Sequence, residues 1–571
     1  MMYTFILWGA LLGIAAIWVA VRGWRMGGPG QRLGRVFDNI CDATEYAKRR
    51  WLLPDAPARW LFGRVSRLQV VTLAVMLGYL LVFSLVGIVY NTWVTPIKGS
   101  TLHNTRTGLG GFSDRVGALA YALTPFTILL SNRESILSLI TGIPHQHFNF
   151  LHRWLGRIMF VQAFLHTLGW TIIEGKLYQP QPSAYAGLMA EQYIIFGVVA
   201  MFLITLMLVL STQTAIGWIG YEAFKLSHWI IAVLYIGACW GHWDKLWCWM
   251  VPSLALVVID QAVRGLRTLY IHAGRREGSS FGFKCAEARI SLLGTGDDLV
   301  VRLDFDYEHP EPWQAGQHFH VCFPSLSVWQ SHPFTPSSSP DPNTKMQHHT
   351  YLLRVRKGQT ARLAALGNAA TVPAILSGPY GRAYPSYDAE NVLAVAGGTG
   401  VTFAVPIVLA ALKHQVAAKS ALEFVWVVGK AQDILWLEPE MALLKSAMKA
   451  SPNLRVKVFV TRDSEPHQGF GLDNEAEKGG VSRAASTASS DHAILESLLV
   501  QDIAGFSVSF LGDHHPAMAE IVDDFVDRSE TVGGTMEIVG SGPEAMGSDL
   551  RSAVSNVRVA ENLNFHWDSR A

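Results

Sequence analysis

The chain of 571 residues has little charge, because Asp, Glu, Lys and Arg make up 16% of it whereas 50% of the residues are hydrophobic. Soluble domains carry about 25% charged residues, so this shortage argues against an entirely soluble protein. The 46 Lys and Arg residues nearly balance the 45 Asp and Glu residues. The chain therefore lacks the excess of positive charge that is typical of nucleic-acid-binding proteins.

Cysteine is scarce as well. The five cysteines are scattered without a CxxC pair or a CxxCH sequence: Cys41, Cys239, Cys248, Cys285 and Cys322. Their spacing excludes a zinc ribbon, an iron–sulfur cluster bound by cysteines and a covalently attached c-type haem. So few cysteines in so long a chain also exclude a small disulfide-linked domain.

Long uncharged apolar stretches, in contrast, are concentrated before residue 265. There are seven of them: Tyr3–Val21, Val70–Tyr90, Val116–Asn132, Ile158–Ile173, Gln192–Tyr221, Leu226–Trp243 and Leu246–Ile259. A helix needs about 20 residues to cross the bilayer core, so the sequence predicts a multidomain membrane protein with an all-α transmembrane bundle of about seven helices. The first stretch is followed by Arg22 and Arg25 rather than by a small-residue cleavage site, which indicates an uncleaved anchor.

The distribution of Lys and Arg predicts the orientation of the bundle. Ten of these residues lie within residues 22–67, whereas the loops after Tyr90, Ile173 and Trp243 carry at most three each. Positively charged loops stay on the cytoplasmic side. We therefore expect the N-terminus outside and everything beyond residue 265 in the cytosol.

The pattern changes at about residue 281 to short β-like runs with turns, and after residue 390 strands alternate with helices. We expect an antiparallel β-barrel domain over 280–388 and an α/β domain with a parallel sheet over 389–571. A Ser-, Ala- and Gly-rich segment at about 463–492 predicts a disordered insert. The membrane half divides into 1–114, with helices and a basic cytosolic loop, and 115–270.

Two of the apolar helices carry histidines at the same spacing of 14 residues: His152 and His166, then His228 and His242. This spacing places the two histidines of one helix about 21 Å apart along its axis and within about 40° of one face. Two such helices side by side predict two stacked b-type haems with axial imidazoles. The first histidine of each helix, His152 or His228, is expected on the cytosolic side. A lone histidine at a helix end is usually only an interfacial residue, and we assign His145 and His147 to that class.

Haems with two axial histidines cannot accept a hydride, so a flavin is expected to feed them single electrons. Two regions suit a flavin: a stretch with an aromatic and a hydroxyl side chain, and a basic Gly-Gln-Thr turn that opens a short helix. The candidate FAD-binding residues are His332, Pro333, Phe334 and Thr335 in the first region and Arg354, Gly358 and Thr360 in the second. Either region alone is a weak signal.

Two further Gly-rich turns each follow an apolar strand and open a helix. They comprise Gly397, Gly398, Thr399, Gly400, Val401 and Thr402 in the first and Ser541, Gly542 and Pro543 in the second. Glycines at such places let a phosphate approach the backbone. Two such turns at the carboxyl ends of parallel strands define a nucleotide crevice, so these residues are candidates to bind NADPH.

Over residues 115–571 the chain resembles fungal ferric-chelate reductases of the ferric reductase and NADPH oxidase superfamily. The resemblance rests on the stretch Leu151–Arg157, the two histidine pairs, the flavin and glycine motifs, and the Gly-Pro turn followed by Glu544 and Met546. It implies a cytosolic ferredoxin-reductase-like module. It also implies that electrons pass from cytosolic NADPH through FAD and two haems to an outer acceptor, with the four histidines as axial ligands.

Three features depart from the family pattern. Ser541 stands where the family often has a cysteine, so a hydroxyl is expected near the nicotinamide. The arginine that commonly follows the Val-Trp-Val-Val strand is missing, which leaves Lys430 or Arg462 to bind the 2′-phosphate and leaves NADPH against NADH open. The C-terminal stretch Phe565–Arg570 differs too, and Trp567 is a candidate to stack on the flavin.

The sequence thus predicts a ferric-chelate reductase of the plasma membrane, which reduces extracytoplasmic ferric or cupric chelates and supplies a separate ferrous iron transporter. It needs no catalytic side chain beyond those that bind cofactors. Two alternatives stay open. A superoxide-generating NADPH oxidase would share every cofactor. A transporter or channel is disfavoured, because the only charged residues between positions 192 and 243, Glu222 and Lys225, lie at a helix boundary.

Overall fold

The computed structural model describes residues 2–26, 43–274, 282–384, 389–414, 420–464, 493–500, 503–558 and 563–568. Nearly all of the predicted disordered insert, residues 465–492, lies outside these ranges. The chain forms two compact units. One consists of residues 1–35 and 68–265, and the other of residues 36–67 and 266–571.

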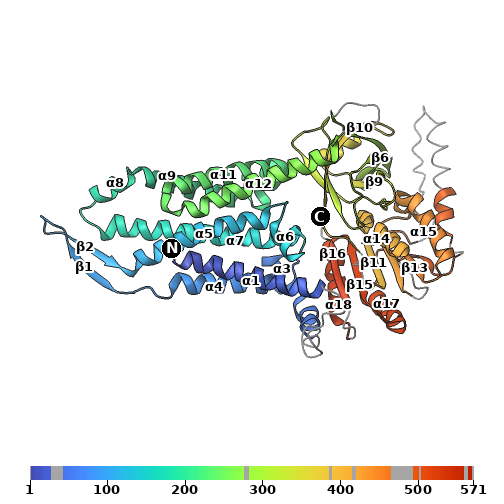
Figure 1. The fold of residues 1–571 in the computed structure, drawn as a ribbon, viewed down its shortest axis with the longest axis horizontal. Coiled ribbons are helices and arrows are strands. Elements are labelled where there is room, and N and C mark those ends of the chain that lie inside the picture. The colour runs from blue at the N-terminus through green and yellow to red at the C-terminus, as the bar shows by residue number, and fades with distance from the viewer. Residues whose placement is uncertain are drawn as a thin grey trace. The chain divides into compact units, whose positions relative to one another are not determined.

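The first unit is a bundle of helices with one β-hairpin (Figure 1). Its elements are α1 (Met2–Met26), α4 (Arg67–Leu85), β1 (Thr92–Pro96), β2 (His103–Thr107), α5 (Gly108–Ser131), α6 (Ile136–Thr141), η2 (His145–Phe148), α7 (Asn149–Ile172), η3 (Ile173–Leu177), α8 (Ser183–Met189), α9 (Gln192–Leu210), α10 (Gln213–Ile219), α11 (Tyr221–His242), η4 (Asp244–Leu246) and α12 (Trp247–His272). Each of the seven predicted apolar stretches overlaps one of the long helices. The hairpin was not predicted.

Among the described residues, five helices are long and apolar enough to cross a membrane, namely those containing α1, α4, α9, α11 and α12. The helices α5 and α7 have 24 residues each and are therefore also long enough to cross a membrane. Both helices contain charged residues, Asp114 and Arg115 in α5 and Arg153 and Arg157 in α7, which make them less apolar. By length and composition the structure thus supports five spans where the sequence predicted about seven.

The two histidine-bearing helices of the bundle each pack along a neighbour, α7 against α5 and α11 against α9. The core between the helices contains fully buried side chains such as Leu119, Leu123, Leu155 and Ile236. Many apolar side chains on the outside of the bundle are exposed, as expected for helices that face lipid. The bundle is therefore packed inside and apolar outside.

The second unit contains a six-stranded antiparallel sheet with the strand order β8-β7-β10-β5-β6-β9. The strands are β5 (Ala286–Leu293), β6 (Val300–Glu308), β7 (His318–Cys322), β8 (Ser331–Phe334), β9 (Met346–Arg354) and β10 (Thr371–Tyr380). The backbone N–H of Ser337, just after β8, donates to the carbonyl of Thr350 in β9 at 2.8 Å. This bond brings the two edges of the sheet together, as expected for a barrel.

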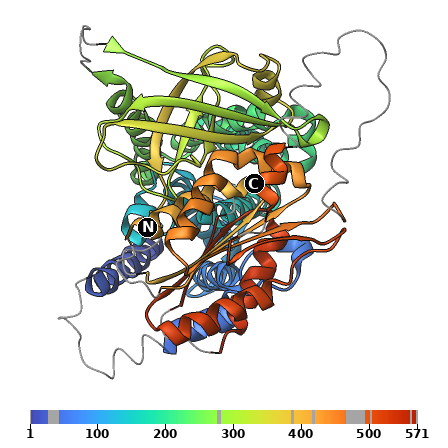
Figure 2. The same cartoon turned by 90° about the vertical axis from the view of Figure 1, so that its right-hand side faces the viewer.

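The same unit contains a parallel sheet with the order β14-β13-β12-β11-β15-β16. Its strands have the orange and red colours of the C-terminal part of the chain in Figure 2. Its strands are β11 (Asn391–Gly397), β12 (Leu422–Val428), β13 (Leu454–Val460), β14 (Phe506–Phe510), β15 (Met536–Ser541) and β16 (Leu563–Asp568). The predicted α/β architecture is therefore present. The helices that follow the strands are α14 (Val401–His414), α15 (Glu438–Ala450), α17 (Met518–Val532) and α18 (Glu544–Asn556).

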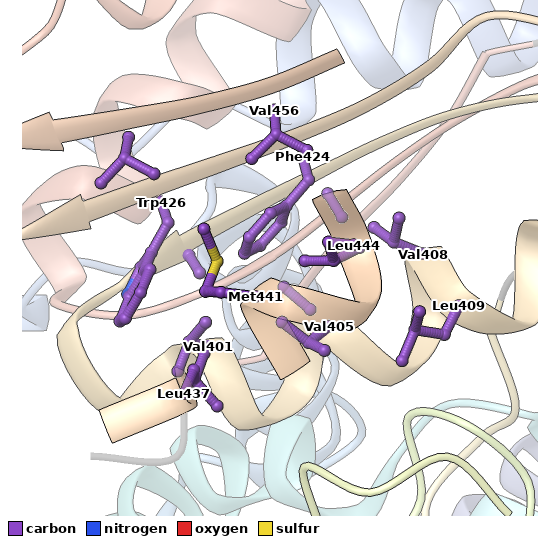
Figure 3. Close-up of a cluster of buried hydrophobic side chains, with 14 of the residues drawn as sticks. Val401, Val405, Val408, Leu409, Phe424, Trp426, Leu437, Met441, Leu444 and Val456 are labelled. Atoms are coloured by element: carbon purple, nitrogen blue, oxygen red, sulfur yellow. The ribbon is translucent and has the colours of Figure 1, made fainter. Parts of the chain in front are cut away.

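Successive residues of a strand point to opposite faces of the sheet, and helices cover both faces of this parallel sheet. Phe424 and Trp426 pack with Val401 of α14 and Met441 of α15 on one face (Figure 3). Val425, between them in β12, belongs to the core beneath α17 and α18 on the other face. This two-sided burial explains the nearly continuous apolar strands of the sequence.

Part of the basic loop belongs to the second unit. Its elements are η1 (Lys48–Leu52) and α3 (Arg59–Phe62). Between them, the carboxylate of Asp55, whose side chain is 6% exposed, accepts hydrogen bonds from Arg551 at 2.7 Å and Ser548 at 2.6 Å, both in α18. The loop is therefore docked on the parallel-sheet domain.

Candidate functional site

The structure brings the four predicted haem ligands together in two pairs. The ring centres of His152 in α7 and His228 in α11 lie 6.2 Å apart, and those of His166 and His242 on the same two helices lie 6.0 Å apart. Two imidazoles that each place a nitrogen about 2.0 Å from one metal ion have ring centres about 6 Å apart. The spacing of both pairs fits a metal ion bound between the rings.

Three of the four rings are oriented at Nδ1 by a backbone carbonyl: His152 by Thr127 at 2.9 Å, His166 by Ser113 at 2.8 Å and His242 by Tyr193 at 2.8 Å. A carbonyl only accepts, so Nδ1 carries the proton and the lone pair remains on Nε2, the atom that would bind a metal. Among the described residues, the buried Nδ1 of His228 has no such partner.

Two glycines make room for the rings of the second pair. A Cβ atom on Gly117 of α5 would lie 2.5 Å from Nδ1 of His166, and one on Gly197 of α9 would lie 2.6 Å from Nδ1 of His242. Such contacts are too close, so these positions accept only glycine. Sequence reasoning missed both residues, because their importance depends on which helices pack together.

The chemistry of the donor set matches haem better than a metal held by side chains alone. Within the part of the chain that the structure describes, no group of three or more His, Cys, Asp or Glu could hold a metal ion. Two imidazoles are too few for a side-chain metal site, whereas a haem needs only axial ligands because its macrocycle supplies the others. The residues of both pairs therefore fit a b-type haem.

The two predicted Gly-rich turns lie side by side, because β11 and β15 are parallel neighbours with Ala396 opposite Ser541. A Cβ atom on Gly397 would meet Cδ of Pro543 at 2.6 Å, and one on Gly400 would meet the backbone of Ser541. The close packing of the turns therefore requires glycine at these positions. Both turns lie at the carboxyl ends of their strands, where nucleotides bind in parallel sheets.

Local hydrogen bonds fix the shape of the first turn. Gly398 has a φ of +53°, which favours glycine, and its carbonyl accepts from the indole N–H of Trp426 at 3.0 Å. The hydroxyl of Thr402 donates to the carbonyl of Thr399 at 3.2 Å. Val401 begins α14, so the turn leads directly into a helix N-terminus, which is suited to a phosphate.

The first candidate flavin region lies in and just after the edge strand β8. His332, Pro333 and Phe334 belong to the strand, and Thr335 follows it. The ring of Phe334 packs partly against the core of the barrel, whereas Pro333 is exposed. The region thus offers side chains at the rim of the barrel.

The second candidate flavin region follows β9, at the other edge of the sheet. Gly358 has a φ of +96°, and the hydroxyl of Thr360 accepts from the N–H of Arg356 at 2.9 Å. Gln359, which begins the short helix α13 (Gln359–Ala364), is only 6% exposed, and neither amide atom has a partner among the described residues. A buried amide without a partner is costly, so this side chain fits a ligand bound at the turn.

A carboxylate that the sequence did not single out binds the predicted cations of both domains. Asp298 lies 2.9 Å from Arg354, 3.0 Å from Lys430 and 3.6 Å from Arg462. The hydrogen bond from Lys430, together with the charges of the two arginines, lowers the pKa of Asp298. Asp298 thus joins the flavin candidate Arg354 to both candidates for the 2′-phosphate.

The expectation that Trp567 stacks on a flavin is wrong. The indole is only 5% exposed and packs against Gly540 and Gly547, between β15 and α18. Side chains alternate along β16, so the neighbouring His566 points to the opposite face. There it stacks on Tyr384 with ring centres 4.5 Å apart.

Comparison with known families gives three matches along the chain. The ferric reductase-like transmembrane component matches residues 116–239, an FAD-binding domain matches 282–384 and the ferric reductase NAD-binding domain matches 389–555. Both Gly-rich turns lie within the NAD-binding match. The first match contains three of the four paired histidines, and His242 follows its end by a few residues.

Curated relatives point the same way. The ferric/cupric reductase transmembrane component 2 of Saccharomyces cerevisiae is 26% identical over 85% of this chain and 64% of its own length. The ferric reductase transmembrane component 3 of the same yeast is 27% identical over 78% of this chain and 59% of its own length. A probable cell surface ferric reductase of Aspergillus oryzae is 26% identical over 62% and 48%. The chain thus spans about half to two thirds of the length of these relatives.

Similarity to solved structures is weaker. The ferredoxin reductase of carbazole 1,9a-dioxygenase aligns with 50% of this chain and 68% of its own chain, at 14% identity and a TM-score of 0.31. This similarity is too low to support a conclusion.

Proposed function

The chain belongs to the ferric reductase family, and on that basis we propose that it moves electrons from cytosolic NADPH across a membrane to a ferric or cupric chelate. NADPH gives up two electrons, so two Fe(III) ions become Fe(II) while NADPH becomes NADP⁺ and one proton is released. A separate transporter would take up the ferrous iron. We place the enzyme in the plasma membrane, with about seven spans and the N-terminus outside.

The two histidine pairs carry this proposal. Each pair would hold one b-type haem through Nε2, and α7 and α11 each provide one ligand to both. The two sites are separated by 14 residues on each helix, which corresponds to about 21 Å along the axis. When bound, haems carry single electrons and FAD divides the electron pair of a hydride. Between the sites, buried residues such as Leu123, Leu155 and Ile236 exclude water.

The second unit would bind and orient the other two cofactors. The rim of the barrel and the turn after β9 would hold FAD, with the buried amide of Gln359 as a hydrogen-bonding group that the sequence had not ranked among its candidates. The paired Gly-rich turns would hold NADPH at the carboxyl ends of β11 and β15. Lys430 and Arg462 would face its 2′-phosphate.

The experiment compares two acceptors on purified protein in nanodiscs with FAD and NADPH. We expect rapid reduction of ferric citrate under nitrogen and little cytochrome c reduction that is sensitive to superoxide dismutase in air. The reverse pattern would identify a superoxide-generating oxidase. A His228→Ala variant should lose haem and ferric reduction together, whereas a transporter with a regulatory module would show no haem spectrum in either form.

A further inference from the structure

A cavity of about 360 Å³ lies in the first unit, where the segment after α4 and the β1–β2 hairpin meet the start of α5 and η3. Its lining includes Trp93 and Arg106 of the hairpin, Gly110, Gly111 and Arg115 of α5, and Tyr178. Small-molecule sites have volumes of about 300–1,000 Å³. The cavity is therefore large enough for a chelate of a metal ion and much larger than dioxygen requires.

The cavity is close to the His166–His242 pair through α5 itself. Gly110, Gly111 and Arg115 line the cavity, and Ser113 on the same turns of α5 accepts the hydrogen bond from His166. Three residues, from Gly110 to Ser113, correspond to about 4.5 Å along a helix. A molecule in this cavity would lie within about one helical turn of the residue that orients His166.

The charge of the lining is entirely positive. Arg106 and Arg115 are its only members that are charged at neutral pH, and none of the lining residues is Asp or Glu. The nearest acids on the same elements are Asp114, which accepts from the indole of Trp170 at 3.1 Å, and Glu174 in η3. Neither belongs to the lining, so the cavity favours an anion.

The two arginines differ in how they are held. The guanidinium of Arg115 lies 4.1 Å from the ring centre of Tyr3 and donates to the backbone carbonyl of Val86, so its position is fixed. Arg106 is exposed on β2, and among the described residues it has no hydrogen-bond or ion-pair partner. It is therefore available to a ligand that enters from solvent.

We propose that this cavity binds the electron acceptor as an anionic polycarboxylate chelate of ferric iron, with Arg106 and Arg115 as the cations that recognise the carboxylates. The inference rests on the proposed function and names the place and charge of its substrate. The bound Fe(III) gains one electron and leaves as Fe(II), and no bond within the chelating carboxylates is broken. Neutral dioxygen would gain nothing from the two charges.

The test reverses one charge in the cavity and one beside it. Arg106→Glu should raise the KM for ferric citrate by about tenfold or more, because a charge-assisted contact becomes a repulsion. Lys98→Glu is the matched control, since Lys98 is exposed in the same hairpin but does not line the cavity. Arg106→Lys should recover most of the affinity. The cationic acceptor hexaammineruthenium(III) should show no increase in KM with Arg106→Glu.

Binding of gallium(III) citrate, which is not reduced, separates this inference from the proposed function. We expect the holoprotein in nanodiscs to bind it by titration calorimetry, and Arg106→Glu to weaken that binding as much as it raises the KM. If ferric citrate is reduced but Arg106→Glu behaves like Lys98→Glu, the cavity is not the acceptor site although the enzyme is a reductase. If gallium citrate binds through Arg106 but no iron is reduced, the binding site stands and the proposed activity is wrong.

Discussion

In the helical bundle the paired histidines are set in place by the protein itself: backbone carbonyls hold three of the rings, and Gly117 and Gly197 provide the space for two of them. In the second unit, the cations that should meet cofactor phosphates already have a partner. Lys430 and its neighbouring arginines all lie against the carboxylate of Asp298.

The difference fits the different residence times that we expect of the proposed cofactors. A preformed site lowers the ordering cost of binding, which suits haems that stay in the protein through every turnover. A nucleotide must leave after each hydride transfer. Under the proposed function, cations that return to Asp298 when the phosphate departs would remain neutralised, which would stabilise the empty site and favour release.

The largest expected effect is the loss of one ligand from a pair. His242→Ala should lower the haem content from two per chain to about one and reduce ferric citrate reduction by more than about 100-fold, because even second-shell changes cost 10–100-fold in metal affinity. Haem is measured as the pyridine haemochrome. His147→Ala is the control, since His147 in η2 belongs to neither pair. Full haem content in His242→Ala would contradict the assignment.

A methyl group added at the second pair should have the next largest effect. Gly117→Ala and Gly197→Ala place a Cβ against the rings of His166 and His242, and overpacking of this kind costs about 1–3 kcal/mol. We expect roughly tenfold weaker retention of one haem while the other stays bound. Gly156→Ala in α7 and Gly237→Ala in α11 are matched controls, since a Cβ there meets no atom within 4 Å. Equal losses of haem in all four variants would contradict the role of Gly117 and Gly197 in making room for the histidine rings.

Removing the internal carboxylate should tighten nucleotide binding. Asp298→Asn removes the carboxylate that Lys430 and Arg462 share, and the KM for NADPH should fall by about two- to fivefold, as expected for partly exposed ion pairs. The KM for NADH should stay the same, because NADH has no 2′-phosphate. Asp523→Asn, which removes an exposed charge on α17, serves as the control. An equal change in the KM for both nucleotides would show that these cations do not bind the 2′-phosphate.

The smallest effect concerns His348 on the barrel, which lies beside two carboxylates and has no proposed cofactor role. The carboxylate of Asp304, 3.7 Å from the imidazole, and a hydrogen bond to Asp306 raise the pKa of His348 to about 9. The stabilisation is complete below the unfolded pKa of about 6.5 and is lost as the pH rises through about 9. His348→Gln should lower the free energy of unfolding of the module by about 1 kcal/mol or less at pH 6, with no difference above pH 10.

Thermal melting of the holoprotein followed by flavin release measures this stability. His514→Gln is a suitable control, because His514 is an exposed histidine of the same unit. A difference between His348→Gln and the unmodified chain that persists above pH 10 would contradict the charge-pair explanation.

The sequence was sufficient to predict those parts of the candidate site that depend on regular secondary structure. A fixed helical rise made the 14-residue spacing of the histidines meaningful, and the strand–turn–helix order identified both Gly-rich turns. Their contact follows from β11 and β15 being neighbours, a pairing typical of parallel sheets. The alternation along β16 would have revealed that His566 and Trp567 face opposite sides, but the stacking expectation did not use it.

The remaining features depend on tertiary contacts that no local pattern contains. Gly117 matters only because α5 packs on α7, and Gly197 only because α9 packs on α11. Asp298 joins residues more than 50 positions away in the sequence. The cavity at Arg106 forms where four separate segments meet, and its hairpin was read from the sequence only as a weakly charged loop.

The central claim is that each histidine pair holds one haem. It is tested most directly by haem quantification together with low-temperature electron paramagnetic resonance of the oxidised protein in nanodiscs. The account predicts two b-type haems per chain, both low-spin with two axial imidazoles. One haem or none per chain, or a high-spin signal from a stoichiometric haem, would contradict it.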